Sequence, residues 1–464
     1  MKPSGSSQHC SGLLALLPAL AALFAWAVLS AVISPPLLQA EEPTVLAQAG
    51  KTSAKTKTQT KPAKPKAETL PWPQNVTTLA GEGAVLVVDN HAHPGQPREL
   101  YALNAEKDFI PASILKIVTS GAALEFLGPD FRFKTDFLLT KNNDLWIVGY
   151  GDPHLVSEEL ALVVKELQKR GLKKVRNILI DNSYFQKDII LDGNTQTRSP
   201  FDAYNGAYGA NFNTVAFKRD KKGQVSRAAE HIPLTPLALK VAAQTKGPGV
   251  FTFNISESPQ AAELNSGEIF KAHLKEAGLP VEGEILTGQT APARRKIFYR
   301  HESSLPLEAA VKLLMEHSNN FMTNQIFLAL GAEFYGPPAS LEKSQAVMNA
   351  FFQRHSLKPI TMGDGSGLSR LTTMTARQMA EVLAVVEPGR GVFSRSQDGL
   401  VLSKTGTMSD IKTLAGYLER PGEPDRPLSF VILLNGPNYN GVRDQILDLL
   451  KDRFLAAPPS VGSG

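Results

Sequence analysis

The chain has 464 residues, of which 42% are hydrophobic and 20% are charged. That length allows two or three domains, and that composition excludes a largely disordered chain and a multispan membrane protein. Residues 1–67 contain seven lysines and two glutamates, so this segment carries the whole formal net charge of +5. The rest of the chain is formally neutral, which argues against a nucleic-acid-binding face on the folded part.

The N-terminus has the pattern of an export signal. Lys2 and a polar stretch precede an apolar run over 12–34, and small residues that suit signal peptidase follow at 38–40 and 47–49. The sequence therefore predicts a signal peptide over 1–49, with cleavage favoured over a signal anchor, although about 20 apolar residues can span a bilayer. The predicted location is the periplasm, with inner-membrane contact only through this segment if it is not cleaved.

A basic linker is expected over 50–77. Its first part consists mostly of Lys, Thr, Ala, Pro and Gln, and such a composition cannot bury enough apolar surface to fold alone. Cys10 is the only cysteine and precedes the apolar run. The sequence therefore excludes a disulfide scaffold and a Cys-based zinc site.

The folded part opens with alternating strands and helices. Periodicity and turn residues predict a β-hairpin over 84–101, a helix from Pro111 to Gly128, strands over 131–139 and 145–148, a helix from Ser157 to Gly171, and a strand over 175–181. The turn of the hairpin holds His91 and His93. An H-x-H pair can bind a metal, but the sequence offers no third ligand, so we interpret both as loop residues.

The C-terminal half is expected to be helical first and then rich in strands. The pattern predicts one helix from Ser304, a second to about Gly331, a third from Thr375 to near Pro388, strands over 400–404, 413–418 and 430–435, and a last helix over 442–455. Thr375 and Gln378 have the spacing of a capping box.

The first chemical motif is Ser113-Ile114-Leu115-Lys116. Positions i and i+3 share a helix face, so the lysine amine can reach the serine hydroxyl, and a helix N-terminus favours negative charge near that hydroxyl. The S-x-x-K pattern recurs at 340–343 and 409–412, so alone it is weak. Only the first match follows a Pro-Ala helix start and leads into a strongly apolar helix; the match at 340–343 is typical of a surface helix start.

The other two motifs are Ser318-Asn319-Asn320 and Lys404-Thr405-Gly406-Thr407. A serine and an amide two residues apart can point into one cleft, although polar residues at a helix junction are commonly caps. Glycine at a strand end permits close approach of a substrate backbone. A lysine and hydroxyls beside it can bind a carboxylate.

In this order the three motifs form a serine–lysine acyl-transferase set. With them, the chain resembles the low-molecular-mass class C penicillin-binding proteins, which are D-alanyl-D-alanine carboxypeptidase/endopeptidases. The resemblance covers most of residues 78–455, and it extends to Leu100-Tyr101, Pro111-Ala112, Gly151-Asp152-Pro153, the segments 181–185 and 364–369, and Asn435-Gly436.

The resemblance implies a mixed α/β (α+β) fold. A β-lactamase/transpeptidase-like domain, with an antiparallel sheet flanked by helices, is expected from residues 78–135 and 286–464. Inserted domains are expected over 136–285, between the first and second motifs, and the innermost insertion near 215–245 is short.

The same resemblance implies a serine-type D-Ala-D-Ala carboxypeptidase with an acyl-enzyme intermediate. Ser113 is the expected nucleophile and Lys116 takes its proton. Ser318 relays that proton to the leaving D-alanine. The backbone N–H groups of Ser113 and Thr407 are expected to form the oxyanion hole.

Substrate contacts are also implied by the resemblance. Lys404, Thr405 and Thr407 are expected to bind the terminal carboxylate, and Asn320 the peptide backbone. Asp152 is expected to face the diaminopimelate amine of the substrate, although an Asp-Pro turn explains it equally. The expected partners are peptidoglycan peptides and β-lactam antibiotics, and neither a metal nor a cofactor is required.

Three other functions remain open from the residues. A serine β-lactamase would use the same acylation groups, but the long insertion argues against it. A catalytically idle cell-wall-binding or penicillin-binding protein would keep the fold without turnover. A Ser-His-Asp esterase would need a G-x-S-x-G elbow, and Ser366 has Asp364 rather than glycine two residues before it.

Overall fold

The structure is a computed structural model that describes residues 70–255 and 257–455. The expected signal segment 1–49 and most of the expected linker 50–77 lie outside the described residues. Within the described ranges, no helix is long and apolar enough to cross a membrane.

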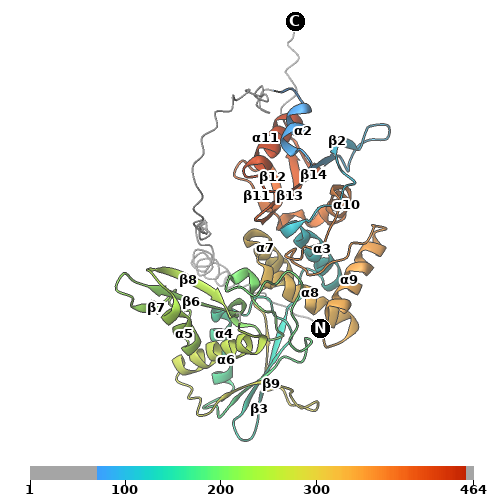
Figure 1. The fold of residues 1–464 in the computed structure, drawn as a ribbon. Helices are drawn as coiled ribbons and strands as arrows, with labels where there is room; N and C mark the ends of the chain where they lie inside the picture. Colours follow the sequence, from blue (N-terminus) through green and yellow to red (C-terminus); the bar gives the residue numbers. More distant parts are fainter. Residues whose placement is uncertain (1–69, 256, 456–464) are drawn as a thin grey trace, which may run out of the picture.

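A six-stranded antiparallel sheet lies at the centre of the domain that contains all three motifs (Figure 1). Its strands, in spatial order, are β11 (Ser394–Arg395), β12 (Val401–Met408), β13 (Ile411–Arg420), β14 (Glu423–Asn435), β1 (Ala84–Val88) and β2 (Glu99–Leu103). The pairing of β1 with β2 confirms the predicted hairpin. Because β11 pairs only with Leu402 and Ser403, the edge of β12 beyond this pair has no strand beside it in the described chain.

Helices cover both faces of this sheet. One face packs on α2 (Gln74–Ala80) and α11 (Val442–Phe454), and the other on a helical layer, so Val85 and Leu86 belong to different core clusters. That layer contains α3 (Lys116–Leu127), α7 (Leu307–His317), α8 (Asn320–Tyr335), α9 (Leu341–Arg354) and α10 (Ala376–Val386). The antiparallel sheet flanked by helices confirms the expected fold class.

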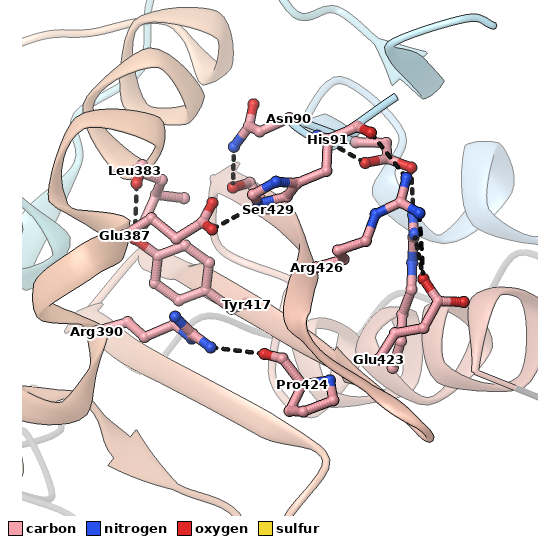
Figure 2. A network of polar contacts seen from close by, with 12 residues as sticks. Asn90, His91, Leu383, Glu387, Arg390, Tyr417, Glu423, Pro424, Arg426 and Ser429 are labelled. Atoms are coloured by element: carbon pink, nitrogen blue, oxygen red, sulfur yellow. Dashed lines mark hydrogen bonds and ion pairs between the residues drawn. The ribbon is translucent and has the colours of Figure 1, made fainter. Parts of the chain in front are cut away.

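A polar network ties the hairpin turn to this domain (Figure 2). His91 Nε2 lies 2.6 Å from Glu387 Oε1, and Asn90 Nδ2 donates to Ser429 Oγ at 2.9 Å. Arg426 Nη2 donates to the carbonyl oxygen of His91 at 2.8 Å. His91 therefore has an ion-pair partner from the η5 segment (Glu387–Val392), and no group of three metal-ligating side chains occurs in the described chain.

The chain between the first two motifs forms a second sheet with strand order β10-β3-β4-β5-β9. These strands are β3 (Lys134–Leu139), β4 (Leu145–Gly149), β5 (Ile178–Asp181), β9 (Ile285–Gln289) and β10 (Tyr299–Glu302). The helices α4 (Ser157–Lys169) and α6 (Pro259–Glu276) pack on it. β9 pairs with β5 and β10 pairs with β3, so strand pairing in this sheet continues to Glu302, beyond the predicted boundary at 285/286.

A third, small sheet occupies the innermost insertion. It has the order β7-β6-β8, with β6 (Thr214–Arg219), β7 (Val225–Arg227) and β8 (Gly249–Asn254), and it packs with α5 (Pro236–Gln244) around Phe217. The segment that the sequence marked as short thus has its own small core.

Most predicted elements occur with shifted ends. The capping box of Thr375 and Gln378 is confirmed, and Ser340 caps α9 as the sequence indicated. The helix α8 continues past Gly331 to Tyr335. A Cβ atom at Gly331 would lie 2.8 Å from the backbone nitrogen of Ser344, so this glycine permits α8 and α9 to pack closely.

Candidate active site

Ser113 lies in a single turn of 3-10 helix, Ala112–Leu115, that leads directly into α3. The first residue of α3 is Lys116, and its side chain is fully buried. Its Nζ lies 3.0 Å from Ser113 Oγ and 2.7 Å from Asn320 Oδ1, and it donates to the carbonyl oxygen of Ser366 at 2.8 Å. The structure therefore brings the serine and lysine of the first motif together with the asparagine of the second.

Neighbouring segments contact the backbone just before Ser113 and hold it in place. Ala112 has φ +50, a left-handed conformation that is unfavourable for alanine. A Cβ atom at Gly367 would lie 2.0 Å from the carbonyl oxygen of Ala112, so only glycine fits there. Thr413 Oγ1 donates to the carbonyl oxygen of Pro111 at 2.7 Å. The turn that contains Ser113 is thus held between β13 and the 364–369 loop.

The 364–369 loop is organised around one buried carboxylate. Asp364 is fully buried and accepts hydrogen bonds from the backbone nitrogens of Ser366, Gly367 and Ser369 at 3.0, 3.1 and 3.2 Å. This arrangement fixes the Ser366 carbonyl that accepts from Lys116. Sequence reasoning included this segment in the family resemblance but did not identify its contact with the lysine.

The second motif lies at the junction of α7 and α8. Ser318 follows the last residue of α7 with φ +53, and Asn319 caps α8 by accepting from the backbone nitrogen of Met322 at 3.0 Å. Asn320 is the first residue of α8, and its Nδ2 lies 3.4 Å from the carbonyl oxygen of Phe201. The amide of Asn320 therefore bridges Lys116 and the inserted segment, a contact that sequence reasoning missed.

The third motif lies within β12. Lys404 is buried and donates from Nζ to the carbonyl oxygen of Thr405 at 2.9 Å, whereas Thr405 and Thr407 are exposed. A Cβ atom at Gly406 would lie 3.0 Å from the backbone nitrogen of Ser113 and 2.1 Å from Thr413 Oγ1. Glycine is required because β12 passes so close to the turn that contains Ser113.

Burial and like charge change the acidity of both lysines. Burial lowers the pKa of Lys116 well below its usual value, the positive charge of Lys404 lowers it further, and the carboxylate of Asp364 opposes this shift. Burial, together with the charge of Arg443, lowers the pKa of Lys404 to about 7. A buried lysine with a lowered pKa is partly neutral near neutral pH, and a neutral amine can accept a proton.

Comparison with known proteins identifies the family. The family model described as the D-Ala-D-Ala carboxypeptidase 3 (S13) family matches residues 78–236 and 249–388. The chain belongs to the S13 family of D-Ala-D-Ala carboxypeptidases. The S13 chain is therefore a serine carboxypeptidase that acts on the D-Ala-D-Ala ends of peptidoglycan peptides.

Two relatives agree with this assignment. The S13 chain is 26% identical to a D-alanyl-D-alanine carboxypeptidase of Actinomadura sp., over 76% of this chain and 78% of the relative. It is 26% identical to the carboxypeptidase DacB of Haemophilus influenzae, over 72% and 82% of the two chains.

The fold is similar to that of penicillin-binding protein 4 from H. influenzae. The TM-score is 0.66 at 20% identity, and the match covers 82% of this chain and 99% of the other. A second structure of that protein, complexed with a β-lactam, matches with a TM-score of 0.64 at 19% identity over the same shares of the two chains.

Asp152 does not join the cluster around Ser113 and Lys116. Its carboxyl group is 2% exposed, and Oδ1 accepts from the backbone nitrogen of His154 at 2.8 Å. Burial, with the negative charge of Glu159, raises the pKa of Asp152 to about 6. The Asp-Pro segment thus forms an interior turn of the inserted part, and this burial is at odds with the expected contact between Asp152 and a substrate amine.

Proposed function

We propose that Ser113 is the nucleophile of this carboxypeptidase and that Lys116 is its general base. The observation that carries the proposal is the 3.0 Å separation of Lys116 Nζ from Ser113 Oγ, in a site where burial and Lys404 lower the pKa of the amine. Ser113 Oγ attacks the carbonyl carbon between the last two D-alanines while its proton passes to Lys116. The C–N bond then breaks and leaves an ester on Ser113.

The proton must then reach the leaving amine. We assign this relay to Ser318, which occupies a left-handed position at the end of α7. Glycine normally takes that position because a side chain there costs about 1 kcal/mol or more. A serine in such a strained position, two residues before Asn320, supports a role for its hydroxyl rather than for its backbone alone. Water then hydrolyses the ester and restores Ser113.

The edge of β12 is proposed to hold the substrate. An extended peptide can add to an open sheet edge through main-chain hydrogen bonds, and β12 is open from Lys404 onward in the described chain. Lys404, Thr405 and Thr407 would bind the terminal carboxylate. The backbone nitrogens of Ser113 and Thr407 would stabilise the oxyanion, which the close approach of Gly406 to Ser113 supports.

The same acylation chemistry extends the proposal to β-lactams and to cross-linked peptides. A β-lactam offers a strained amide to the same hydroxyl, and the solved relative that is complexed with a β-lactam supports this. Cleavage of a cross-link differs only in the leaving amine. We also propose that the enzyme acts after export in the periplasm, as the apolar run over 12–34 and the following small residues indicate.

Intact-protein mass and D-alanine release together test this proposal. The full chain is incubated with penicillin, and separately with a peptide that ends in D-Ala-D-Ala. We expect a penicilloyl adduct that maps to Ser113, and release of one D-alanine from the peptide. Loss of penicillin without a lasting adduct would instead establish a β-lactamase, and an unmodified protein with intact peptide would establish an idle binding protein.

A further inference from the structure

A cavity of about 350 Å³, lined by both apolar and amide side chains, lies in the inserted part, outside the cluster around Ser113. Its volume lies within the range of about 300–1,000 Å³ that is typical of small-molecule sites. It is lined by the segments 182–189 and 287–290, the start of α6, and the loop that holds Asn205. Neither the carboxypeptidase reaction nor the proposed acyl-enzyme mechanism uses these residues.

The cavity lies at the carboxyl ends of parallel strands. β4, β5 and β9 run parallel to one another, and Asp181 at the end of β5 is paired with Gln289 at the end of β9. Asn182 follows β5 and Thr290 follows β9, and both line the cavity. In α/β sheets this edge is the usual place for a ligand, because loops there diverge and leave a crevice.

The cavity adjoins a smaller hollow that Asn320 lines. Ile189 and Asn205 line both this cavity and the smaller hollow beside Asn320. Asn205 Nδ2 donates to Gln325 Oε1 at 2.9 Å and to the carbonyl oxygen of Phe321 at 3.1 Å, so the shared wall is attached to α8 just after Asn320. The cavity and the hollow beside Asn320 therefore lie on either side of one wall.

The lining favours a neutral ligand with many hydrogen-bonding groups. Six amide side chains line the cavity: Asn182, Gln186, Asn205, Asn213, Gln260 and Gln289. Lys187 and Asp188 are exposed and opposite in charge. Glu263 is buried, accepts from the backbone nitrogen of Gly288 at 2.9 Å, and has a pKa that is raised chiefly by burial. Asn205 and Asn213 use their amides within the wall, and Gln260 and Gln289 each donate to a neighbouring oxygen. The lining therefore offers the Gln186 amide, the amide oxygens of Gln260 and Gln289 and the Glu263 carboxyl to hydroxyl and acetamido groups, and no cluster of cations to an anion.

We propose that this cavity binds an N-acetylated amino sugar, namely the sugar that carries the stem peptide whose end Ser113 cleaves. The inference rests on the proposed function, because that function makes the ligand part of a peptidoglycan unit. About four residues separate the scissile bond from the sugar, and an extended chain of that length spans roughly 14 Å. The cavity thus belongs to the acyl side of the substrate and selects sugar-bearing peptides over free peptides.

The test compares two substrates. One is a free stem peptide that ends in D-Ala-D-Ala, and the other is the same peptide attached to its disaccharide. We expect wild-type kcat/KM to be about tenfold higher for the sugar-bearing peptide, which is the effect of roughly one to two good hydrogen bonds. In the double variant Gln260→Ala/Gln289→Ala this preference is lost, while kcat/KM for the free peptide is unchanged.

Two matched controls keep the outcome specific. Gln168→Ala removes an amide of the inserted part that binds the Ala277 carbonyl and does not line the cavity, so it retains the preference. If the double variant does not fold, Glu263→Gln replaces it. Its control is Glu268→Gln, also on α6, where the carboxylate accepts from the backbone nitrogen of Leu237 but lies outside the cavity lining.

Equal kcat/KM for the two substrates in the wild type would overturn the sugar site. A failure of the proposed function has a different signature, because neither substrate would then release D-alanine and penicillin would leave no adduct. In that case calorimetry with the disaccharide alone tests the sugar site. Wild-type binding that the double variant loses supports sugar binding in the cavity, and an absence of binding by the wild type refutes it.

Discussion

Ser113–Lys116 and Ser340–Lys343 have the same spacing and both lie at the start of a helix, yet their side chains have different partners. Lys116 Nζ lies 3.0 Å from Ser113 Oγ, whereas Ser340 Oγ accepts from the backbone nitrogen of Lys343 at 3.3 Å. Lys343 Nζ donates instead to the carbonyl oxygens of Gly336 and Pro338 at 2.6 and 2.8 Å. The Lys116 amine thus contacts the serine of its motif, whereas the Lys343 amine caps the turn before α9.

The backbone explains the difference. Ser113 is inside a helical turn, so positions i and i+3 face the same way. Ser340 is an N-cap with φ −139 and ψ 167, and this extended backbone directs its hydroxyl to the helix N–H groups. Burial also lowers the pKa of the first lysine, because Lys116 is fully buried next to Lys404. The same motif brings its two side chains together only where the fold places both residues in one helical turn and buries the lysine.

The largest expected effect is the difference between two single variants, in which one serine or the other is replaced by alanine. Ser113→Ala should abolish the penicilloyl adduct and lower D-alanine release by at least about 10³-fold, because the alanine side chain has no hydroxyl oxygen that could form the ester. Ser340→Ala should form the adduct at the wild-type rate. Intact mass at several times of incubation measures both. An adduct on Ser113→Ala would break the comparison and move the nucleophile elsewhere.

A second prediction concerns the charge that distinguishes the buried lysine. Acylation needs neutral Lys116, so its rate rises with pH through the pKa of that amine. Lys404 has a pKa of about 7 and is therefore cationic below that pH, where it lowers the pKa of Lys116. Lys404→Met removes this charge, so the acid limb of the rate profile should move to higher pH by about one unit or more.

The position of the limb, rather than the rate itself, is the readout for Lys404→Met. Loss of a contact with the substrate carboxylate alone would lower the penicillin acylation rate without raising the pKa of Lys116, and would leave the acid limb in place. Lys343→Met is the matched control, since Lys343 binds only backbone carbonyls in the described structure, and its profile should coincide with that of the wild type. An unmoved limb in Lys404→Met would show that burial alone sets the acidity of Lys116.

Local patterns in the sequence predicted local structure well. The hairpin over 84–101 and the capping box at Thr375 are both present, because turn residues and cap side chains act within a few positions. The match at 340–343 was also correctly interpreted as a helix start. In each case the interaction that decides the structure joins residues that are near in the chain.

Long-range contacts were not accessible from the sequence. β9 and β10 are short strands, and periodicity indicates that a strand has a buried face without identifying its partner, so their pairing with β5 and β3 could not be predicted. The bond from Lys116 to the Ser366 carbonyl joins residues 250 positions apart. The burial of Asp152 depends likewise on packing in the inserted part, which a Gly-Asp-Pro motif does not encode.

The smallest expected effect is on stability and concerns Ser340 as a cap. Ser340→Ala removes the acceptor for the Lys343 backbone nitrogen and should lower the free energy of unfolding by about 1 kcal/mol. Ser340→Asn supplies another capping oxygen and should unfold like the wild type. Thermal unfolding and the acylation rate are measured for both variants, because the first reports on capping and the second on catalysis. Ser340→Ala should lose stability and keep its acylation rate. A variant that lost rate without losing stability would instead assign the second serine–lysine pair a part in the reaction.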